Sequence, residues 1–154
     1  MTPARVNVHA TAIVVGGTGL LFVGRSGSGK SITAFDCMVA ARRSGMPAAL
    51  VADDRVFLSC SGADLIGSCP EAIVGLIEIR GSGIARVPHV VSAPLHLAVL
   101  VAENDPAERL PAPQETYDVP GLGSLPMLRL VQGAREPLAI ISTFYPDIGI
   151  PSPF

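Results

Sequence analysis

Residues 24–31 read Gly-Arg-Ser-Gly-Ser-Gly-Lys-Ser. This stretch fits the G-x-x-x-x-G-K-[ST] pattern of a phosphate-binding loop. Its glycines allow backbone angles that other residues avoid, and its amide groups can cradle phosphate oxygens. A lysine at the seventh position reaches the β- and γ-phosphates, and the hydroxyl at the eighth can bind Mg²⁺. We therefore expect the whole loop to contact a nucleotide: Gly24, Arg25, Ser26, Gly27, Ser28, Gly29, Lys30 and Ser31.

The sequence on both sides of the loop supports this interpretation. Residues 20–23 are Leu-Leu-Phe-Val, a short apolar run suited to a buried strand. Residues 32–43 carry apolar side chains at helical spacing, and Gly45 and Pro47 end that pattern. The alternative is a turn rich in glycine and serine that binds nothing. Strand, loop and helix in this order favour a nucleotide site.

Composition excludes several classes of protein. Hydrophobic residues make up 49% of the 154 residues, charged residues 16%, and the net charge is −2. No apolar run approaches the roughly 18 residues that span a bilayer, and the start of the chain lacks a signal-peptide layout. We expect a cytoplasmic protein without a membrane span. The sequence contains no basic patch that would indicate nucleic-acid binding. The three cysteines lack metal-ligand spacing, so they are interpreted as packing residues.

The segment before the loop is predicted to form a hairpin. Residues 6–15 read as a strand with a break near His9 and Ala10, and residues 16–19 (Gly-Gly-Thr-Gly) are a hairpin signal. The second arm then leads into the loop. On its residues alone, His9 is more simply a surface or half-buried strand histidine than part of a site.

Two acidic residues follow the next predicted strand. Residues 48–54 read Ala-Ala-Leu-Val-Ala-Asp-Asp. A carboxylate at the end of a strand beside a phosphate loop can hold Mg²⁺ or accept a proton. A plain turn is the alternative, because Asp is common where strands end. If the pleat continued, Asp53 and Asp54 would point to opposite sides, one facing the phosphates and the other supporting the loop.

Further strands are predicted beyond this point. Residues 73–81 form one in which Glu78 and Arg80 share a face, either as functional groups or as an edge-strand salt bridge. Residues 94–102, 127–131 and 138–142 are predicted strands, 103–113 a surface loop that holds Arg109, and 144–154 an extended tail. We expect a single domain, residues 1–154, with one predicted helix and several strands.

Some classes of phosphate-loop protein do not fit. The guanine-specific N-K-x-D sequence and the L-S-G-G-Q stretch of transporter ATPases are absent. Small-molecule kinases built from alternating strands and helices fit poorly, because most of the predicted elements are strands.

The chain resembles the catalytic domain of HPr kinase/phosphorylase, in the short form that lacks the N-terminal domain. Four stretches carry the resemblance: His9 with residues 13–22, the loop 24–31, residues 50–56 (Leu-Val-Ala-Asp-Asp-Arg-Val) and residues 75–84 (Gly-Leu-Ile-Glu-Ile-Arg-Gly-Ser-Gly-Ile). The resemblance implies an α/β fold with a mixed, largely antiparallel sheet, a P-loop and a helix, similar to the nucleotide-binding core of phosphoenolpyruvate carboxykinase.

The resemblance also implies roles for single residues. Lys30 and the loop amides would hold the phosphates, and Ser31 and Glu78 would bind Mg²⁺. One of Asp53 and Asp54 would be the general base, with Asp54 preferred. His9 would lie near the transferred phosphate. Arg109 would neutralise its charge.

The implied activity is transfer of phosphate from ATP to a serine of HPr or an HPr-like phosphocarrier in a phosphotransferase system, with phosphorolysis by inorganic phosphate as a second activity. The family often forms hexamers, so a homo-oligomer is expected. Ile32 departs from the family, whose members often have an acidic residue there, and the C-terminal segment matches weakly. Two alternatives remain: a related kinase with another protein or a small molecule as substrate, and a non-catalytic ATP sensor.

Overall fold

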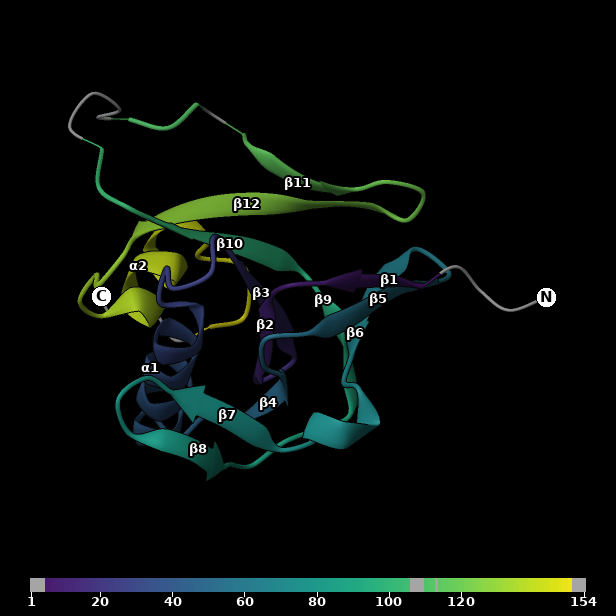
Figure 1. Ribbon diagram of the computed structural model, residues 1–154. Coiled ribbons are helices and arrows are strands. Elements are labelled where there is room, and N and C mark those ends of the chain that lie inside the picture. The colour runs from purple at the N-terminus through teal and green to yellow at the C-terminus, as the bar shows by residue number, and fades with distance from the viewer. Residues whose placement is uncertain (1–4, 106–109, 113, 151–154) are drawn as a thin grey trace.

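The computed structural model describes residues 5–105, 110–112 and 114–150 (Figure 1). Its centre is a six-stranded sheet of order β11-β12-β10-β3-β2-β4. Both neighbours of β10 run parallel to it, and the remaining pairs are antiparallel. The strands are β2 (Thr11–Val15), β3 (Thr18–Val23), β4 (Ala48–Ala52), β10 (Leu97–Ala102), β11 (Thr116–Val119) and β12 (Gly123–Val131).

A second sheet and a hairpin complete the β-structure. The second sheet is antiparallel, with the order β1-β5-β6-β9. Its strands are β1 (Val6–Val8), β5 (Val56–Ser61), β6 (Asp64–Ser68) and β9 (Ser92–Leu95). The hairpin pairs β7 (Leu76–Ile79) with β8 (Gly83–Arg86) and follows the 3-10 helix η1 (Glu71–Ile73). The expected mixed, largely antiparallel α/β architecture is confirmed.

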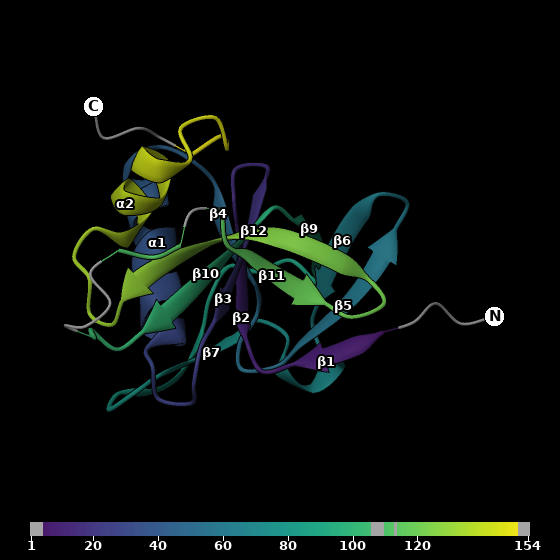
Figure 2. The ribbon, with the colours of Figure 1, turned by 90° about the horizontal axis from the view of Figure 1, so that it is seen from above.

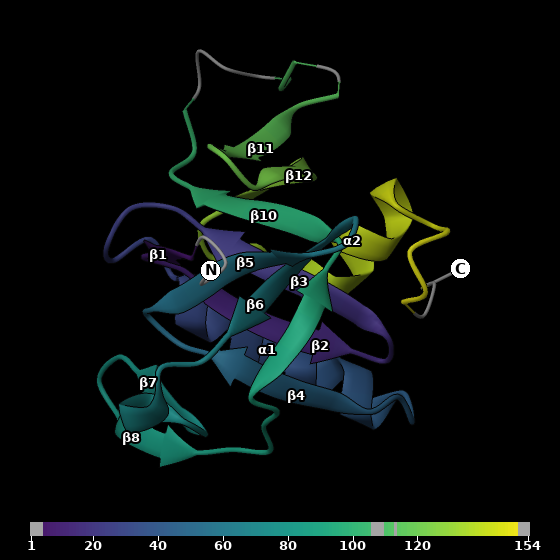
Figure 3. The ribbon, with the colours of Figure 1, turned by 90° about the vertical axis from the view of Figure 1, so that its right-hand side faces the viewer.

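The central sheet lies between two layers. Helices α1 (Lys30–Arg43) and α2 (Pro137–Phe144) cover one face, and the second sheet covers the other (Figures 2 and 3). Each face buries its own apolar cluster. Phe22 and Leu50 belong to the cluster on the helix side, whereas Leu21 and Val51 belong to the other. In the described part of the chain, no helix is long and apolar enough to cross a bilayer.

The hairpin before the glycine loop is confirmed, including its break. β1 ends at Val8, β2 begins at Thr11, and His9 and Ala10 lie between them. β2 and β3 pair antiparallel around a turn at Gly16 and Gly17, where Gly16 has a φ of 59°. A positive φ is readily available to glycine, which explains the residue at this turn.

The predicted strand at residues 94–102 is divided into β9 and β10 at His96. The His96 amide donates to the Gly19 carbonyl at 2.8 Å, and the Gly19 amide donates to His96 Nδ1 at 2.9 Å. These two bonds hold His96 to β3, while β9 pairs with β6 and β10 pairs with β3. One apolar run therefore contributes a strand to each of the two sheets.

The prediction of a strand at residues 138–142 was wrong, because these residues belong to α2. Pro137 occupies the first helical turn, where its fixed φ is favourable. Leu138 and Ile141 are three residues apart, and both are buried against α1. A short apolar run fits strand and helix equally well, so periodicity alone could not decide. The expected tail also begins inside this helix, since Phe144 is its last residue.

The predicted strand at residues 73–81 is shorter than expected. Residue 73 ends η1, and β7 covers only Leu76–Ile79. Residues 81–83 form the tight turn into β8, with φ of 84° at Gly81 and 128° at Gly83. This places Arg80 at the tip of a hairpin, next to the glycine loop.

Candidate active site

One pocket of about 290 Å³ collects most of the residues singled out by sequence. It lies at the start of α1, where the glycine loop, the end of β4, the β1–β2 junction and the β7–β8 hairpin meet. Its lining comprises His9, Thr11, Ser26, Gly27, Gly29, Lys30, Ser31, Ile32, Asp53, Asp54, Glu78, Arg80 and Gln132.

The glycine loop packs tightly and opens toward α1. Gly24 has a φ of 145°, and a Cβ there would lie 2.5 Å from the carbonyl oxygen of Val101, so a side chain cannot be accommodated. Gly29 adopts the left-handed conformation directly before the first residue of α1. Ser28 Oγ is buried without a hydrogen-bond partner. Such an orphaned hydroxyl suits a loop that binds a polar ligand.

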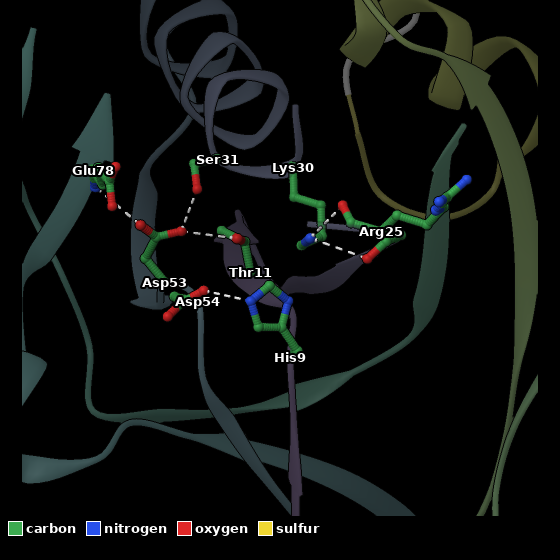
Figure 4. Close-up of polar contacts among 9 residues, drawn as sticks. His9, Thr11, Arg25, Lys30, Ser31, Asp53, Asp54 and Glu78 are labelled. Carbon is green, nitrogen blue, oxygen red and sulfur yellow. Dashed lines mark hydrogen bonds and ion pairs between the residues drawn. The ribbon is translucent and has the colours of Figure 1, made fainter. Parts of the chain in front are cut away.

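Lys30 is buried beneath this loop. Its Nζ donates to the carbonyls of Gly24 and Arg25, each at 3.0 Å (Figure 4). Burial lowers the pKa of Lys30, and the nearby charges of Asp54 and Asp53 partly oppose that shift. The two carbonyls hold the amine at the loop, beside the start of α1.

Asp53 is the hub of the buried hydrogen bonds. Its Oδ1 accepts from Ser31 Oγ at 2.5 Å and from Thr11 Oγ1 at 2.8 Å, while Oδ2 accepts from the Glu78 amide at 2.9 Å (Figure 4). The residue is only 5% exposed. Three of about four acceptor positions of this carboxylate are therefore in use, which leaves about one for a further hydrogen bond.

Asp54 has the opposite character. Its backbone leaves the strand with a φ of 69°, and its Oδ1 lies 2.7 Å from Nε2 of His9. The two side chains are 64% and 51% exposed. The structure thus separates the adjacent aspartates: Asp53 supports the buried side of the site, and Asp54 with His9 faces the open side.

A β-bulge explains where Asp53 points. Ile13 pairs with Leu50, but Ala12 pairs with Ala52, so Val51 is an extra residue on β4. Leu50 packs on the helix side of the sheet, whereas Val51 and Ala52 both pack on the opposite side. Because side chains alternate along a strand, the bulge returns the next residue, Asp53, to the helix side.

Glu78 and Arg80 reach the pocket from the hairpin. The contact between Glu78 and Asp53 is made by the Glu78 backbone amide, and its side chain is exposed. No ion pair joins Glu78 to Arg80, although the structure describes both, so the salt-bridge alternative was wrong. A Cβ added at Gly27 would lie 3.3 Å from Arg80 Nη1, which places this guanidinium against the loop.

Sequence reasoning missed two residues that line the pocket. Thr11 is fully buried in a strand, and Gln132 follows β12 and donates from Nε2 to the Gly27 carbonyl at 3.3 Å. Thr11 could have been found as a polar residue in an apolar strand, but Gln132 follows a strand far along the chain. Arg109 lies outside the described residues, so its predicted place is untested.

The site lacks a dense cluster of metal ligands. Within the described ranges, no group of three or more His, Cys, Asp or Glu side chains could hold a metal ion. The donor set is instead a hydroxyl and a carboxylate, Ser31 and Asp53, with the exposed Glu78 nearby. This set fits Mg²⁺, which usually binds one or two carboxylates and completes its shell with water and substrate phosphates.

Residues 2–94 match the family model of the HPr Serine kinase C-terminal domain. The chain belongs to this family. Among curated relatives, it is 44% identical over 81 residues to the HPr kinase/phosphorylase of Bacillus licheniformis and 39% identical over 80 residues to that of Clostridium botulinum. Each alignment covers 52% of this chain but 24% of the relative. The chain thus spans about a quarter of these HPr kinase/phosphorylases.

The similarity continues in three dimensions. The structure matches that of the Hpr(Ser) kinase/phosphatase from Coxiella burnetii with a TM-score of 0.71 and 27% sequence identity. The match covers 92% of this chain and 95% of that one. The HPr kinase fold therefore extends over the C-terminal part of the chain, beyond the residues that match the family model.

Proposed function

We propose that this chain is an ATP- and Mg²⁺-dependent protein-serine kinase that phosphorylates HPr or an HPr-like phosphocarrier. The observation that carries the proposal is the pocket itself, where the glycine loop with Lys30 meets the exposed pair of Asp54 and His9. Membership of the HPr kinase family and the similarity to kinase/phosphorylases support it. The loop at residues 24–31 would act as a P-loop, in a core similar to that of phosphoenolpyruvate carboxykinase.

Asp53 and Asp54 would have different roles in the reaction. Three of the acceptor positions of Asp53 are occupied by hydrogen bonds, so it would orient Ser31 on the metal side of the phosphates. Asp54 is exposed and lines the pocket, so it would be the general base for an incoming hydroxyl. His9 would hold the Asp54 carboxylate in place, and a base must be positioned before its pKa matters.

The transfer itself would proceed as follows. Asp54 takes the proton of the substrate serine while the serine oxygen forms a bond to the γ-phosphorus, and the bond to the bridging oxygen of ADP breaks. Lys30 and the loop amides stabilise the charge on the phosphate oxygens. Arg109 would add a second positive charge at the transferred group, and Arg80 would lie beside the loop to position the partner serine.

Mg²⁺ would be held by Ser31 with Asp53 or Glu78, and it would neutralise charge on the β- and γ-phosphates. Asp54, the proposed general base, could return the proton in the reverse direction. Phosphorolysis of the phosphoserine by inorganic phosphate is therefore a second candidate activity. The names of the relatives support this candidate.

The test mixes the purified chain with ATP, Mg²⁺ and HPr, and detects phosphoserine on HPr by mass spectrometry. We expect a phosphoserine with the wild-type chain and none with Lys30→Ala, whose fold is checked by circular dichroism. A second tube with phosphorylated HPr and inorganic phosphate tests the reverse reaction through release of pyrophosphate. A folded wild-type chain that leaves HPr unmodified would contradict the proposal.

The outcomes also separate the alternatives. Transfer to a free metabolite or another protein, but not to HPr, would select a related kinase. Tight ATP binding without turnover would select a nucleotide sensor. The family resemblance predicts a homo-oligomer, often a hexamer, and light scattering during gel filtration measures that assembly independently of activity.

A further inference from the structure

We propose that Thr11 is a positioning residue that aims Asp53 at Ser31 and thereby tunes how strongly the site binds Mg²⁺ with its nucleotide. The inference rests on the proposed function and adds to it a residue that no phosphate-loop pattern contains. Thr11 lies on β2, and its side chain is fully buried.

The first step of the argument is the register. The bulge at Val51 shifts the pairing of β2 and β4 by one residue, from Ile13 opposite Leu50 to Ala12 opposite Ala52. The shifted register brings Thr11 opposite Asp53, on the side of the sheet that faces α1. Cross-strand neighbours on one face are close enough to interact, and Figure 4 shows the two side chains pointing toward each other.

The second step is the geometry of the shared oxygen. Thr11 Oγ1 donates to Asp53 Oδ1 at 2.8 Å, and Ser31 Oγ donates to the same oxygen at 2.5 Å. The other oxygen, Oδ2, accepts from the Glu78 amide. Thr11 and the Glu78 amide therefore bind Asp53 through different oxygens, and this fixes the rotation of the carboxylate that meets Ser31.

The third step is the consequence for the metal. Ser31 is the hydroxyl that the loop pattern assigns to Mg²⁺. Loss of a residue that orients a metal ligand by a hydrogen bond, without touching the metal itself, typically changes metal affinity about 10- to 100-fold. Without the Thr11 hydroxyl, Asp53 keeps two bonds but can rotate, so Ser31 is less firmly oriented. Nucleotide binding that does not involve the metal should be unaffected.

The experiment compares Thr11→Val, Thr11→Ser and wild type by calorimetric titration with ATP, once with Mg²⁺ and once with EDTA. Thr11→Val keeps the shape of the side chain and removes the hydroxyl, whereas Thr11→Ser keeps the hydroxyl. Thr18→Val is the matched control: Thr18 is also buried on the same hairpin, but it donates to the Ile148 carbonyl at the opposite end.

We expect Thr11→Val to lose at least about 10-fold of the affinity gained from Mg²⁺, with ATP affinity in EDTA unchanged. Thr11→Ser and Thr18→Val should keep the full Mg²⁺ gain. An unchanged Mg²⁺ gain in Thr11→Val would overturn the inference, as would an equal loss with and without Mg²⁺. If Thr11→Val does not fold, Thr11→Ala answers the same question.

The readout is binding, so it is separate from the test of the proposed function. A wild-type chain that binds ATP with Mg²⁺ but leaves HPr unphosphorylated would refute the kinase proposal and still test Thr11. If the wild-type chain phosphorylates HPr but Thr11→Val keeps the full Mg²⁺-dependent gain in ATP affinity, only the role of Thr11 is refuted.

Discussion

His9 Nε2 and Asp54 Oδ1 lie 2.7 Å apart where the chain passes between the two sheets: His9 lies between β1 and β2, and Asp54 lies between β4 and β5. Both side chains are more than half exposed, so the pair contributes little to stability. Substituting either residue should therefore change phosphoryl transfer without unfolding the chain, which makes the pair a suitable first target for mutagenesis.

Asp54→Asn should reduce phosphoryl transfer by at least about 100-fold, because general bases contribute roughly 10²- to 10⁴-fold. ATP affinity should remain, since the loop is unchanged. His9→Gln should have a smaller effect on the same rate. Asp64→Asn, at an exposed position on β6, is the control. A fully active Asp54→Asn variant would exclude Asp54 as the base.

Lys30 is the single lysine of the sequence, so acylation of the peptide that contains it by an amine-reactive reagent reports on its side chain. Because burial lowers its pKa, a larger share of the amine is uncharged at a given pH than in the unfolded chain. Mass spectrometry should show that the pH midpoint of acylation is lower in the folded chain than in urea. ATP with Mg²⁺ should protect Lys30. Equal labelling with and without ATP would argue against a nucleotide at this loop.

Gly19→Ala should prevent normal folding. A Cβ at Gly19 would lie 2.0 Å from the Pro94 carbonyl oxygen and 3.0 Å from the Cα of Leu95, so the backbone of β9 blocks it. Gly17→Ala is the control on the same hairpin, because nothing lies within 4 Å of its Cβ. Thermal melting followed by circular dichroism should give a normal transition for Gly17→Ala and a lost or strongly lowered one for Gly19→Ala. Similar melting of both variants would refute the close approach of β3 and β9.

Ile141→Ala should lower the free energy of unfolding by about 2–5 kcal/mol, the usual cost of emptying a fully buried aliphatic site. Phe144→Ala, in the same helix but with 66% of its surface exposed, should change it far less. Urea unfolding measures both. If the Phe144 variant were the more destabilised of the two, the placement of α2 on α1 would be wrong.

Asp36→Asn should stabilise the chain at neutral pH but not in acid. Partial burial raises the pKa of Asp36 above the ordinary value of an aspartate, Glu136 raises it further, and Arg43 opposes the shift. The folded state then holds the proton to a higher pH than the unfolded state, so wild-type stability falls as pH rises through that window. Urea unfolding should show the advantage of Asp36→Asn appear above about pH 4. A constant difference between the variants at all pH values would contradict this origin.

The elements nearest the glycine loop were the most predictable, because their signals are local. The strand break at His9, the glycine turn at Gly16 and the start of α1 depend on neighbouring residues alone. The bulge at Val51 was not predictable, since residues 50–52 are all apolar and no local pattern marks the unpaired one. As a result, sequence could propose that Asp53 and Asp54 differ in role but could not say which one faces Ser31.

The remaining differences have a similar cause. His96 divides an apolar run because of a partner, Gly19, that is 77 residues away in the sequence. Residues 138–142 form a helix because α1 offers an apolar face for Leu138 and Ile141. Gln132 reaches the site through β12, which is brought there only when β10 pairs with β3. Contacts over such distances are a property of the folded chain.

The position of β10 limits how far this protein can be shortened. The family match ends at residue 94, yet β10 begins at Leu97 and is the strand that lies against β3. A fragment that ends at residue 94 would leave the backbone N–H and C=O groups on one side of β3 unpaired, next to apolar side chains. Such an exposed edge is a template for self-association. Expression of residues 1–94 alone should therefore yield inclusion bodies, because the strand that covers this side of β3 lies beyond residue 94.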